Sequence, residues 1–268
     1  MSTNNPPPVP LTLEGAAVLH QLFRIDWSSW NAVEPAKKHS ILEEAKHVLF
    51  TLEGDNSGLF SILGHKGDLM MVHFRTGFPA LEEIERTIGR LALNQYLVQT
   101  TSYVSVVELG LYESTQKIYA TLLERGVTPH TPEWTSGIEE LLATQRKAMT
   151  PRLFPEIPSR RYICFYPMDR LRGEQKNWYM EPLPIRAKMM HEHGLIGRRY
   201  ADVVKQIISG SIGFDDWEWG VTLFADDPLV FKKLIYEMRF DEVSAVYAKF
   251  GQFYFGLRHP VTDLEKLF

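Results

Sequence analysis

Two histidines lie two residues apart in the run from residue 177 to residue 220, and only one of them directly precedes a glycine. His193 is followed by Gly194, whereas His191 is followed by a glutamate. Because glycine often ends a helix, we expect the imidazole of His193 to leave the helix face and project into a pocket. A neutral imidazole is a common metal ligand. Single histidines more often have surface or core roles, so residue type alone leaves both interpretations open.

A tyrosine at the end of a predicted strand is a second candidate for chemistry. Tyr166 lies in the apolar run 161–168 and is followed by proline and methionine. An aromatic side chain at a strand end usually packs in the core. Beside a strongly oxidising centre, a phenol can instead give up an electron and a proton and become a radical. Tyr166 therefore has a structural and a catalytic interpretation.

Positive charge is concentrated in one part of the chain. Residues 146–205 contain thirteen Lys and Arg residues and six Asp and Glu residues, a local net charge of +7, whereas the whole chain carries −4. The overall balance argues against general nucleic-acid binding. The local excess fits a solvated basic face. It equally fits a pocket for a small polyanion, because guanidinium groups pair carboxylates through two hydrogen bonds.

Three further side chains between the histidines and residue 220 have ordinary roles available to them. Gln206 lies in a predicted helix, 200–209, where a surface amide is the usual role. Trp217 and Trp219 alternate in a predicted strand, 215–220, so period-two spacing places both on one face. Core packing is the default role for both. The nearby Asp215, Asp216 and Glu218 lack the His or Cys partners of a metal cluster and are interpreted as turn and surface charges.

Several classes of protein are excluded or disfavoured. Cys164 is the only cysteine, so no intramolecular disulfide can form, as is usual in the cytosol. Residues 1–12 read as a disordered Pro-rich arm without the features of a signal peptide. No segment approaches the roughly 20 apolar residues of a membrane span. No P-loop, nucleophile elbow or zinc-protease motif is present. We therefore expect a cytoplasmic protein without membrane or nucleic-acid partners.

The predicted elements repeat one order. Residues 13–112 read strand, helix, strand, strand, helix, strand, and residues 161–268 repeat that order. The second half contains one long helical segment, 183–209, with a break near 194–197. Residues 113–160 form a linker with one predicted helix, 133–148. Two β-α-β-β-α-β units predict an α+β fold in which two ferredoxin-like halves form a dimeric α+β barrel-like subunit.

These motifs together resemble the chlorite dismutase-like superfamily and, within it, the coproheme decarboxylases, also called hydrogen-peroxide-dependent heme synthases. The resemblance rests on the Tyr-Pro-Met motif at 166–168, the run 177–220 and the sequence YEMRFDE at 236–242. It covers most of the chain after Arg152. Before that residue it rests on the order of elements.

The resemblance implies roles for three residues. The His-Gly-x-x-Gly-Arg run at 193–198 implies that His193 is the iron ligand. Tyr166 corresponds to the reactive tyrosine that abstracts a hydrogen atom from a propionate. Gln206 corresponds to the distal side of the porphyrin, where chlorite-splitting relatives have an arginine. A neutral amide cannot supply that positive charge, so Gln206 argues against chlorite dismutation.

The same resemblance implies a binding site for a tetra-anionic porphyrin. Coproheme carries four propionates, which the basic excess between residues 146 and 205 would match. Met168 and Trp217 would contribute to the porphyrin site, and position 170 has an arginine where a lysine is expected. The implied partners of the propionates are Arg152, Arg170, Arg239 and Ser244.

The expected function follows from the resemblance. Iron coproporphyrin III (coproheme) would be substrate and redox centre, hydrogen peroxide the oxidant and heme b the product. The family further implies a homo-oligomer, a ring of five subunits, and transient contact with the iron-inserting chelatase. Two alternatives are a chlorite dismutase or peroxidase-like enzyme, against which Gln206 argues, and a non-catalytic heme-binding or delivery protein, which would not need Tyr166.

Overall fold

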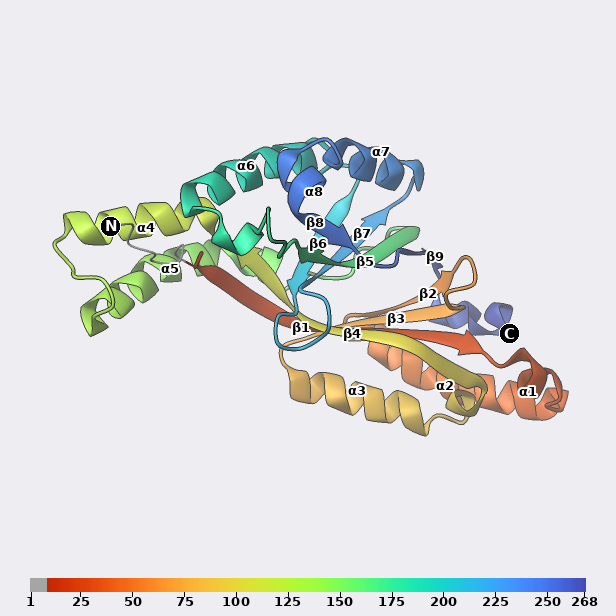
Figure 1. Ribbon diagram of the computed structural model, residues 1–268. Coiled ribbons are helices and arrows are strands. Elements are labelled where there is room, and N and C mark those ends of the chain that lie inside the picture. The colour runs from red at the N-terminus through yellow and green to blue at the C-terminus, as the bar shows by residue number, and fades with distance from the viewer. Residues whose placement is uncertain (1–8) are drawn as a thin grey trace.

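The computed structural model describes residues 9–268 and shows two halves with the same order of elements (Figure 1). The N-terminal half contains β1 (Thr12–Ile25), α1 (Trp27–Asn31), α2 (Pro35–Gly54), β2 (Ser57–Ile62), β3 (Leu69–Arg75), α3 (Phe78–Arg90), the 3-10 helix η1 (Ala92–Tyr96) and β4 (Leu97–Gly110). Residues 1–8 of the predicted Pro-rich arm lie outside the described residues.

The C-terminal half repeats this order with additions near its end. It contains β5 (Tyr162–Arg170), η2 (Trp178–Met180), α6 (Leu183–Arg199), β6 (Lys205–Gly210), β7 (Trp219–Ala225), α7 (Leu229–Met238), α8 (Glu242–Tyr247), β8 (Ala248–Phe250), β9 (Tyr254–Arg258) and η3 (Val261–Leu267). Asp227 caps α7 as its sequence suggests, because its carboxylate accepts a hydrogen bond from the Leu229 amide at 2.9 Å.

All nine strands belong to one antiparallel sheet that closes on itself. The order is β7-β6-β4-β1-β3-β2-β9-β5-β8, and β5 also pairs with β7. The halves therefore join at two seams, β4 with β6 and β2 with β9. This arrangement confirms the predicted α+β class with a barrel-like core.

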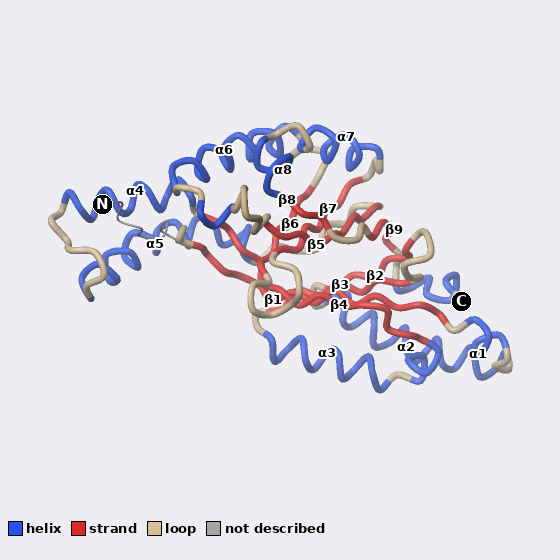
Figure 2. The backbone as a smooth tube through the Cα atoms, viewed as in Figure 1, coloured by secondary structure: helices blue, strands red, loops and turns tan. Residues whose placement is uncertain are grey.

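Side chains alternate between the barrel interior and the outer faces of the sheet. On β1, Val18 and Leu22 face an interior cluster, whereas Leu19 and Phe23 pack under α2 and α3. Helices α6, α7 and α8 cover the opposite side of the barrel (Figure 2). A third apolar cluster, which includes the fully buried Leu234, lies between α6, α7 and the sheet.

The segment between the halves has more helix than the sequence indicates. We predicted one helix at 133–148, but the structure has two, α4 (Tyr112–Glu124) and α5 (Pro132–Leu153). They extend from one end of the barrel (Figure 1). Ile118 and Leu122 of α4 pack against Trp134 of α5, so the two helices bury a small apolar cluster of their own.

The predicted break and the helix at 200–209 are both wrong. Helix α6 continues through Gly194 and Gly197 to Arg199, and Gln206 lies on strand β6 instead. A glycine in a helix interior costs about 1 kcal/mol, which the packing of α6 against the sheet outweighs. Because β6 lies in the sheet, its side chains alternate, and this decides where the Gln206 amide points.

Two predicted strands also differ from the structure. In place of the strand at 215–220, β7 begins at Trp219, so Trp217 lies in the preceding loop. The final strand of the repeated order is divided into the short strands β8 and β9. Within residues 9–268, no helix is long and apolar enough to span a membrane.

Candidate functional site

A cavity lies between the outer face of the C-terminal half of the sheet and the helices above it. Together with its open mouth it encloses about 450 Å³. Polar and apolar side chains from seven elements, together with Arg239 from the turn after α7, form its wall. They are Tyr166, Met168, Arg170, His193, Gln206, Ile208, Val221, Ile235, Met238, Arg239, Ser244 and Phe250.

The strand registers explain how the floor of the cavity forms. Tyr166 of β5 pairs with Val221 of β7, which pairs with Ile208 of β6, so one row of side chains crosses three strands. Gln206 lies two residues before Ile208 and therefore points to the same face. Met168 lies two residues after Tyr166 and extends the floor along β5.

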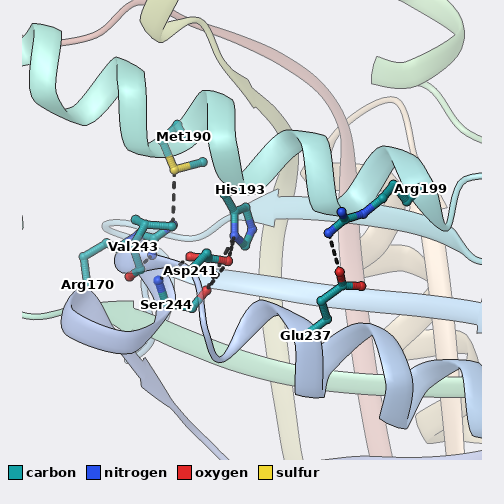
Figure 3. A network of polar contacts seen from close by, with 8 residues as sticks. All are labelled: Arg170, Met190, His193, Arg199, Glu237, Asp241, Val243 and Ser244. Atoms are coloured by element: carbon teal, nitrogen blue, oxygen red, sulfur yellow. Dashed lines mark hydrogen bonds and ion pairs between the residues drawn. The ribbon is translucent and has the colours of Figure 1, made fainter.

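The helices supply the opposite wall. His193 projects from α6, and Asp241 receives it from the turn before α8 (Figure 3). The Nδ1 atom of His193 lies 2.8 Å from Asp241 Oδ2 and 3.5 Å from the Ser244 hydroxyl. Because Nδ1 is engaged by the carboxylate, Nε2 is the ring nitrogen that remains for a metal ion.

Asp241 has two structural tasks. Its Oδ1 atom accepts the Ser244 amide hydrogen at 2.8 Å and caps α8, while Oδ2 faces His193. Burial raises the pKa of Asp241, but the hydrogen bonds from His193 and Ser244 outweigh burial and hold the pKa below its usual value. The carboxylate is therefore ionised at neutral pH and fixes both the orientation and the tautomer of the imidazole.

His191 has a different environment. Its Nδ1 atom pairs with Glu113 of α4, and both side chains are about half exposed. His191 does not line the cavity. The two histidines therefore differ in position: His193 faces the cavity, whereas His191 faces α4.

Arg170 enters the cavity wall from the end of β5. Its guanidinium lies 5.0 Å from the ring centre of Trp178 and donates to the Val243 carbonyl at 3.4 Å and to the Met190 sulfur at 3.6 Å. Burial lowers the pKa of Arg170, yet an arginine remains charged in proteins. These contacts place a fixed positive charge at one edge of the cavity.

Arg239 provides a second, more exposed charge. It is exposed and lies over the ring of Phe250 at 3.7 Å from the ring centre. The rigid Arg170 and the exposed Arg239 therefore offer two guanidinium groups to an anionic ligand.

Tyr166 is deeply buried beside these groups. Its ring stacks on Phe253 at 4.3 Å between centres and contacts Phe250 at 5.8 Å. Burial raises the pKa of Tyr166 well above its usual value. The phenol therefore keeps its O–H at neutral pH, which a hydrogen-atom donor must have.

Seven of the nine residues predicted for the site line this cavity, and two do not. Arg152 is exposed near the end of α5, where its guanidinium lies 3.9 Å from the Met149 sulfur. Trp217 packs against the barrel interior, with the Lys249 ammonium 5.3 Å from its ring centre. Within one subunit, these two side chains are not part of the cavity.

Sequence reasoning missed one polar partner and several apolar walls. Asp241 lies in the same motif at 236–242 as Arg239, and an Asp before a helix is a capping signal. That signal predicts the cap but not the contact with a histidine 48 residues away. The missed apolar walls are Ile208, Val221, Ile235, Met238 and Phe250.

The residues present fit an iron porphyrin. One imidazole with a carboxylate partner suits a metal that brings most of its own ligands, and apolar walls suit a flat macrocycle. Within residues 9–268 there is no group of three or more His, Cys, Asp or Glu residues that could hold a metal ion alone.

Comparisons with known proteins agree with this geometry. The family model described as chlorite dismutase matches residues 38–259. A coproheme decarboxylase from Staphylococcus saprophyticus subsp. saprophyticus is 43% identical over 271 residues, which cover 98% of this chain and 99% of the relative. This relationship confirms the predicted resemblance to the coproheme decarboxylases, and with it the prediction of an enzyme.

Solved structures show the same fold. A structure described as a novel heme-binding protein from Thermus thermophilus has a TM-score of 0.82 and 38% identity, with 98% of each chain covered. A variant of chlorite dismutase from Candidatus Nitrospira defluvii has a TM-score of 0.71 and 17% identity, with 95% of each chain covered. The second similarity concerns the fold alone. The family model matches most of this chain, and two relatives at 43% and 38% identity are covered almost end to end. This chain therefore belongs to the chlorite dismutase family.

Proposed function

We propose that this protein converts two propionates of iron coproporphyrin III to vinyl groups with hydrogen peroxide, giving heme b. The observation that carries the proposal is the cavity itself. It gathers a carboxylate-supported histidine, a buried neutral tyrosine and two guanidinium groups around apolar walls. The 43% identical relative is named for this type of reaction.

In this proposal His193 holds the substrate through its iron. The Nε2 atom would be the ligand, because Asp241 occupies Nδ1. A carboxylate behind the imidazole raises its basicity and prevents ring rotation. Asp241 is itself fixed by its capping bond to Ser244, so ligand geometry and the start of α8 depend on one carboxylate.

The charged groups would position the propionates. Arg170 is held by Trp178 and Val243, and a guanidinium can pair a carboxylate through two hydrogen bonds. Arg239 is exposed and can adjust to a second propionate. The Ser244 hydroxyl adds a donor near His193.

Tyr166 would remove the hydrogen atom. The bound iron supplies the oxidising equivalents when peroxide reacts with it. The Tyr166 side chain then passes an electron and its phenolic proton to that centre, and it recovers a hydrogen atom from the propionate β-carbon. Loss of CO₂ and a second electron leaves the vinyl group. Each propionate, one H₂O₂ and one proton therefore give a vinyl group, CO₂ and two water molecules.

Gln206 favours this reaction over chlorite splitting. Its amide faces the cavity from β6. A neutral amide can donate to and accept from a peroxide, but it lacks the charge that stabilises a departing oxyanion. The alternative of a non-catalytic heme-binding protein is supported by the description of the 38% identical structure. Tyr166 argues against it.

The proposal includes the surroundings of the enzyme. We expect a cytoplasmic homo-oligomer, a ring of five subunits, that meets the iron-inserting chelatase transiently to receive coproheme. Light scattering of the purified protein would test the assembly, and a monomer would contradict that part of the proposal.

One experiment separates the candidate functions. The protein is mixed with iron coproporphyrin III and then titrated with hydrogen peroxide. The porphyrins are separated by chromatography, and their masses are measured by mass spectrometry. We expect stepwise loss of two carboxyl groups and formation of heme b. Binding without loss of carboxyl groups would favour a heme-binding protein, and oxygen release from added chlorite would favour a chlorite dismutase.

A further inference from the structure

Helix α6 contains two interior glycines whose surroundings differ. A β-carbon at Gly194 would meet only a guanidinium nitrogen of Arg198, at 3.9 Å, which is an ordinary contact. A β-carbon at Gly197 would lie 3.3 Å from Gln206 Nε2 and 3.5 Å from Met238 Cε. Glycine is a poor helix former at either position. Only Gly197 lies against residues that line the cavity.

The contact between Gly197 and Gln206 is polar as well as steric. Gln206 reaches from β6 to the helix, and its Nε2 atom donates to the Gly197 carbonyl at 3.5 Å. The same carbonyl accepts from the Tyr200 amide at 3.2 Å at the end of α6. Because only the NH₂ end of an amide can donate to a carbonyl, this contact decides which end of Gln206 faces the helix. It leaves Oε1 and one N–H for the cavity.

We infer that Gly197 is a positioning residue for Gln206. Its missing side chain lets the amide lie against α6, and its carbonyl sets the direction of that amide. This inference rests on the proposed function, in which Gln206 handles peroxide at the substrate iron. A methyl group at position 197 would push the amide into the cavity and weaken its bond to the helix.

The effect should appear in peroxide handling and not in substrate binding. His193, Arg170 and Arg239 hold the substrate in the proposed function, and in the described part of the chain no hydrogen bond or ion pair joins Gly197 to any of them. A displaced amide should slow the peroxide reaction by about tenfold, the factor that corresponds to one net hydrogen bond. The affinity for coproheme should stay within about twofold, because its main contacts are unchanged.

The test compares Gly197→Ala with Gly194→Ala. Both substitutions favour helix formation, and the neighbour at position 197 is the far end of a flexible side chain, so both variants should fold. In the ligand-free protein, the Gln206 side-chain amide is followed by NMR and assigned by its loss in Gln206→Ala. We expect its signals to shift in Gly197→Ala and to stay in place in Gly194→Ala.

The second part measures the coupling between the two positions. Gly197→Ala should slow the reaction of bound coproheme with peroxide in the parent protein but have no further effect in the Gln206→Ala background. Equal slowing in both backgrounds, or amide signals identical to those of Gly194→Ala, would overturn the inference. Failure of the parent protein to form heme b would overturn the proposed function instead, while a shifted amide signal would leave the structural inference standing.

Discussion

The two halves of the barrel have equivalent strand pairing but carry different side chains at matching positions. In the N-terminal half, Gln21 of β1 pairs with Met71, the third residue of β3. In the C-terminal half, Tyr166 of β5 pairs with Val221, the third residue of β7. The position that holds the buried phenol of Tyr166 in one half therefore holds the buried amide of Gln21 in the other.

The next row of paired residues in the sheet also differs between the two halves. Ser57 of β2 pairs with His73 in the N-terminal half, and its counterpart pair is Gln206 with Leu223. The His73 Nδ1 atom lies 2.8 Å from the Ser57 hydroxyl. Ser57 and Gln206 thus place a polar side chain at matching positions, but Ser57 bonds to His73, whose counterpart Leu223 is apolar.

The space above these rows explains the difference. In the N-terminal half it is filled by α2, α3 and the C-terminal segment η3, from which Val261 and Leu264 enter the apolar cluster. The remaining cavity there has about 220 Å³ against about 450 Å³ in the C-terminal half. In the N-terminal half, apolar packing fills the space above the sheet. In the C-terminal half a cavity remains, and α6 and α8 supply the polar side chains His193 and Ser244 to its wall.

The largest expected difference concerns Tyr166. In Tyr166→Phe the shape changes little, so the variant should fold, bind coproheme and react with peroxide. It should not form heme b, because phenylalanine has no O–H to lose. Tyr96→Phe, in the N-terminal half, is the matched control and should convert coproheme normally. Near-normal heme b formation by Tyr166→Phe would direct the search to Tyr162, Tyr179 or Tyr200.

The second prediction concerns packing in the closed half. Leu264 is 1% exposed, so Leu264→Ala should lower the free energy of unfolding by about 3 kcal/mol. The affinity for coproheme should remain unchanged, because the cavity lies in the other half. Ile235→Ala, at the cavity wall, should reverse the pattern, with little loss of stability and weaker binding. Denaturant unfolding and coproheme titration of both variants measure the two effects.

The third prediction concerns acid. Burial, together with the positive charge of the neighbouring Arg75, lowers the pKa of His73 to about 3. The folded protein therefore favours the neutral ring, and its contribution to stability is complete above the unfolded pKa of about 6.5. As pH falls from 6.5 toward 3, this contribution is lost, by about 2 kcal/mol at pH 5.

The His73 prediction is checked by unfolding experiments between pH 7 and pH 5. We expect His73→Gln to lose less stability over this range than the parent protein. His39→Gln, at an exposed position of α2, should follow the parent. Equal pH dependence in all three proteins would show that His73 does not titrate as its burial requires.

The smallest prediction concerns the support of His193. Asp241→Asn removes the negative charge but keeps the shape and a capping oxygen. Coproheme affinity should fall by about tenfold, the lower range for the loss of such a partner. The stretching frequency of the bond between iron and histidine, measured by Raman spectroscopy, should decrease. An unchanged frequency would show that the carboxylate serves α8 alone.

Much of this architecture could be predicted from the sequence. The alternation of apolar residues, the repeated order of elements and the Asp-Pro helix start before Leu229 are local signals, and each agrees with the structure. The site residues Tyr166 and His193 came from motifs. What motifs could not supply was the contact between His193 and Asp241, because it depends on how α6 and α8 meet.

Local signals failed where packing opposed them. Gly194 and Gly197 suggest a helix break, but α6 packs against α4, α7 and α8 and continues through both glycines. The predicted helix at 200–209 is wrong because α6 ends at Arg199 and the six residues of β6 then enter the sheet. Tertiary packing decided both cases, and the position of the Gln206 amide followed from it.

The most direct test of the account is the absorption spectrum of bound iron coproporphyrin III in His193→Ala and His191→Ala. Only His193 faces the cavity, with its Nδ1 atom held by Asp241, whereas His191 pairs with Glu113 outside it. We predict that His193→Ala folds but loses the spectrum of histidine-ligated iron, and that His191→Ala retains it. A parental spectrum in His193→Ala, or its loss in His191→Ala, would contradict the assignment of the C-terminal cavity as the coproheme site.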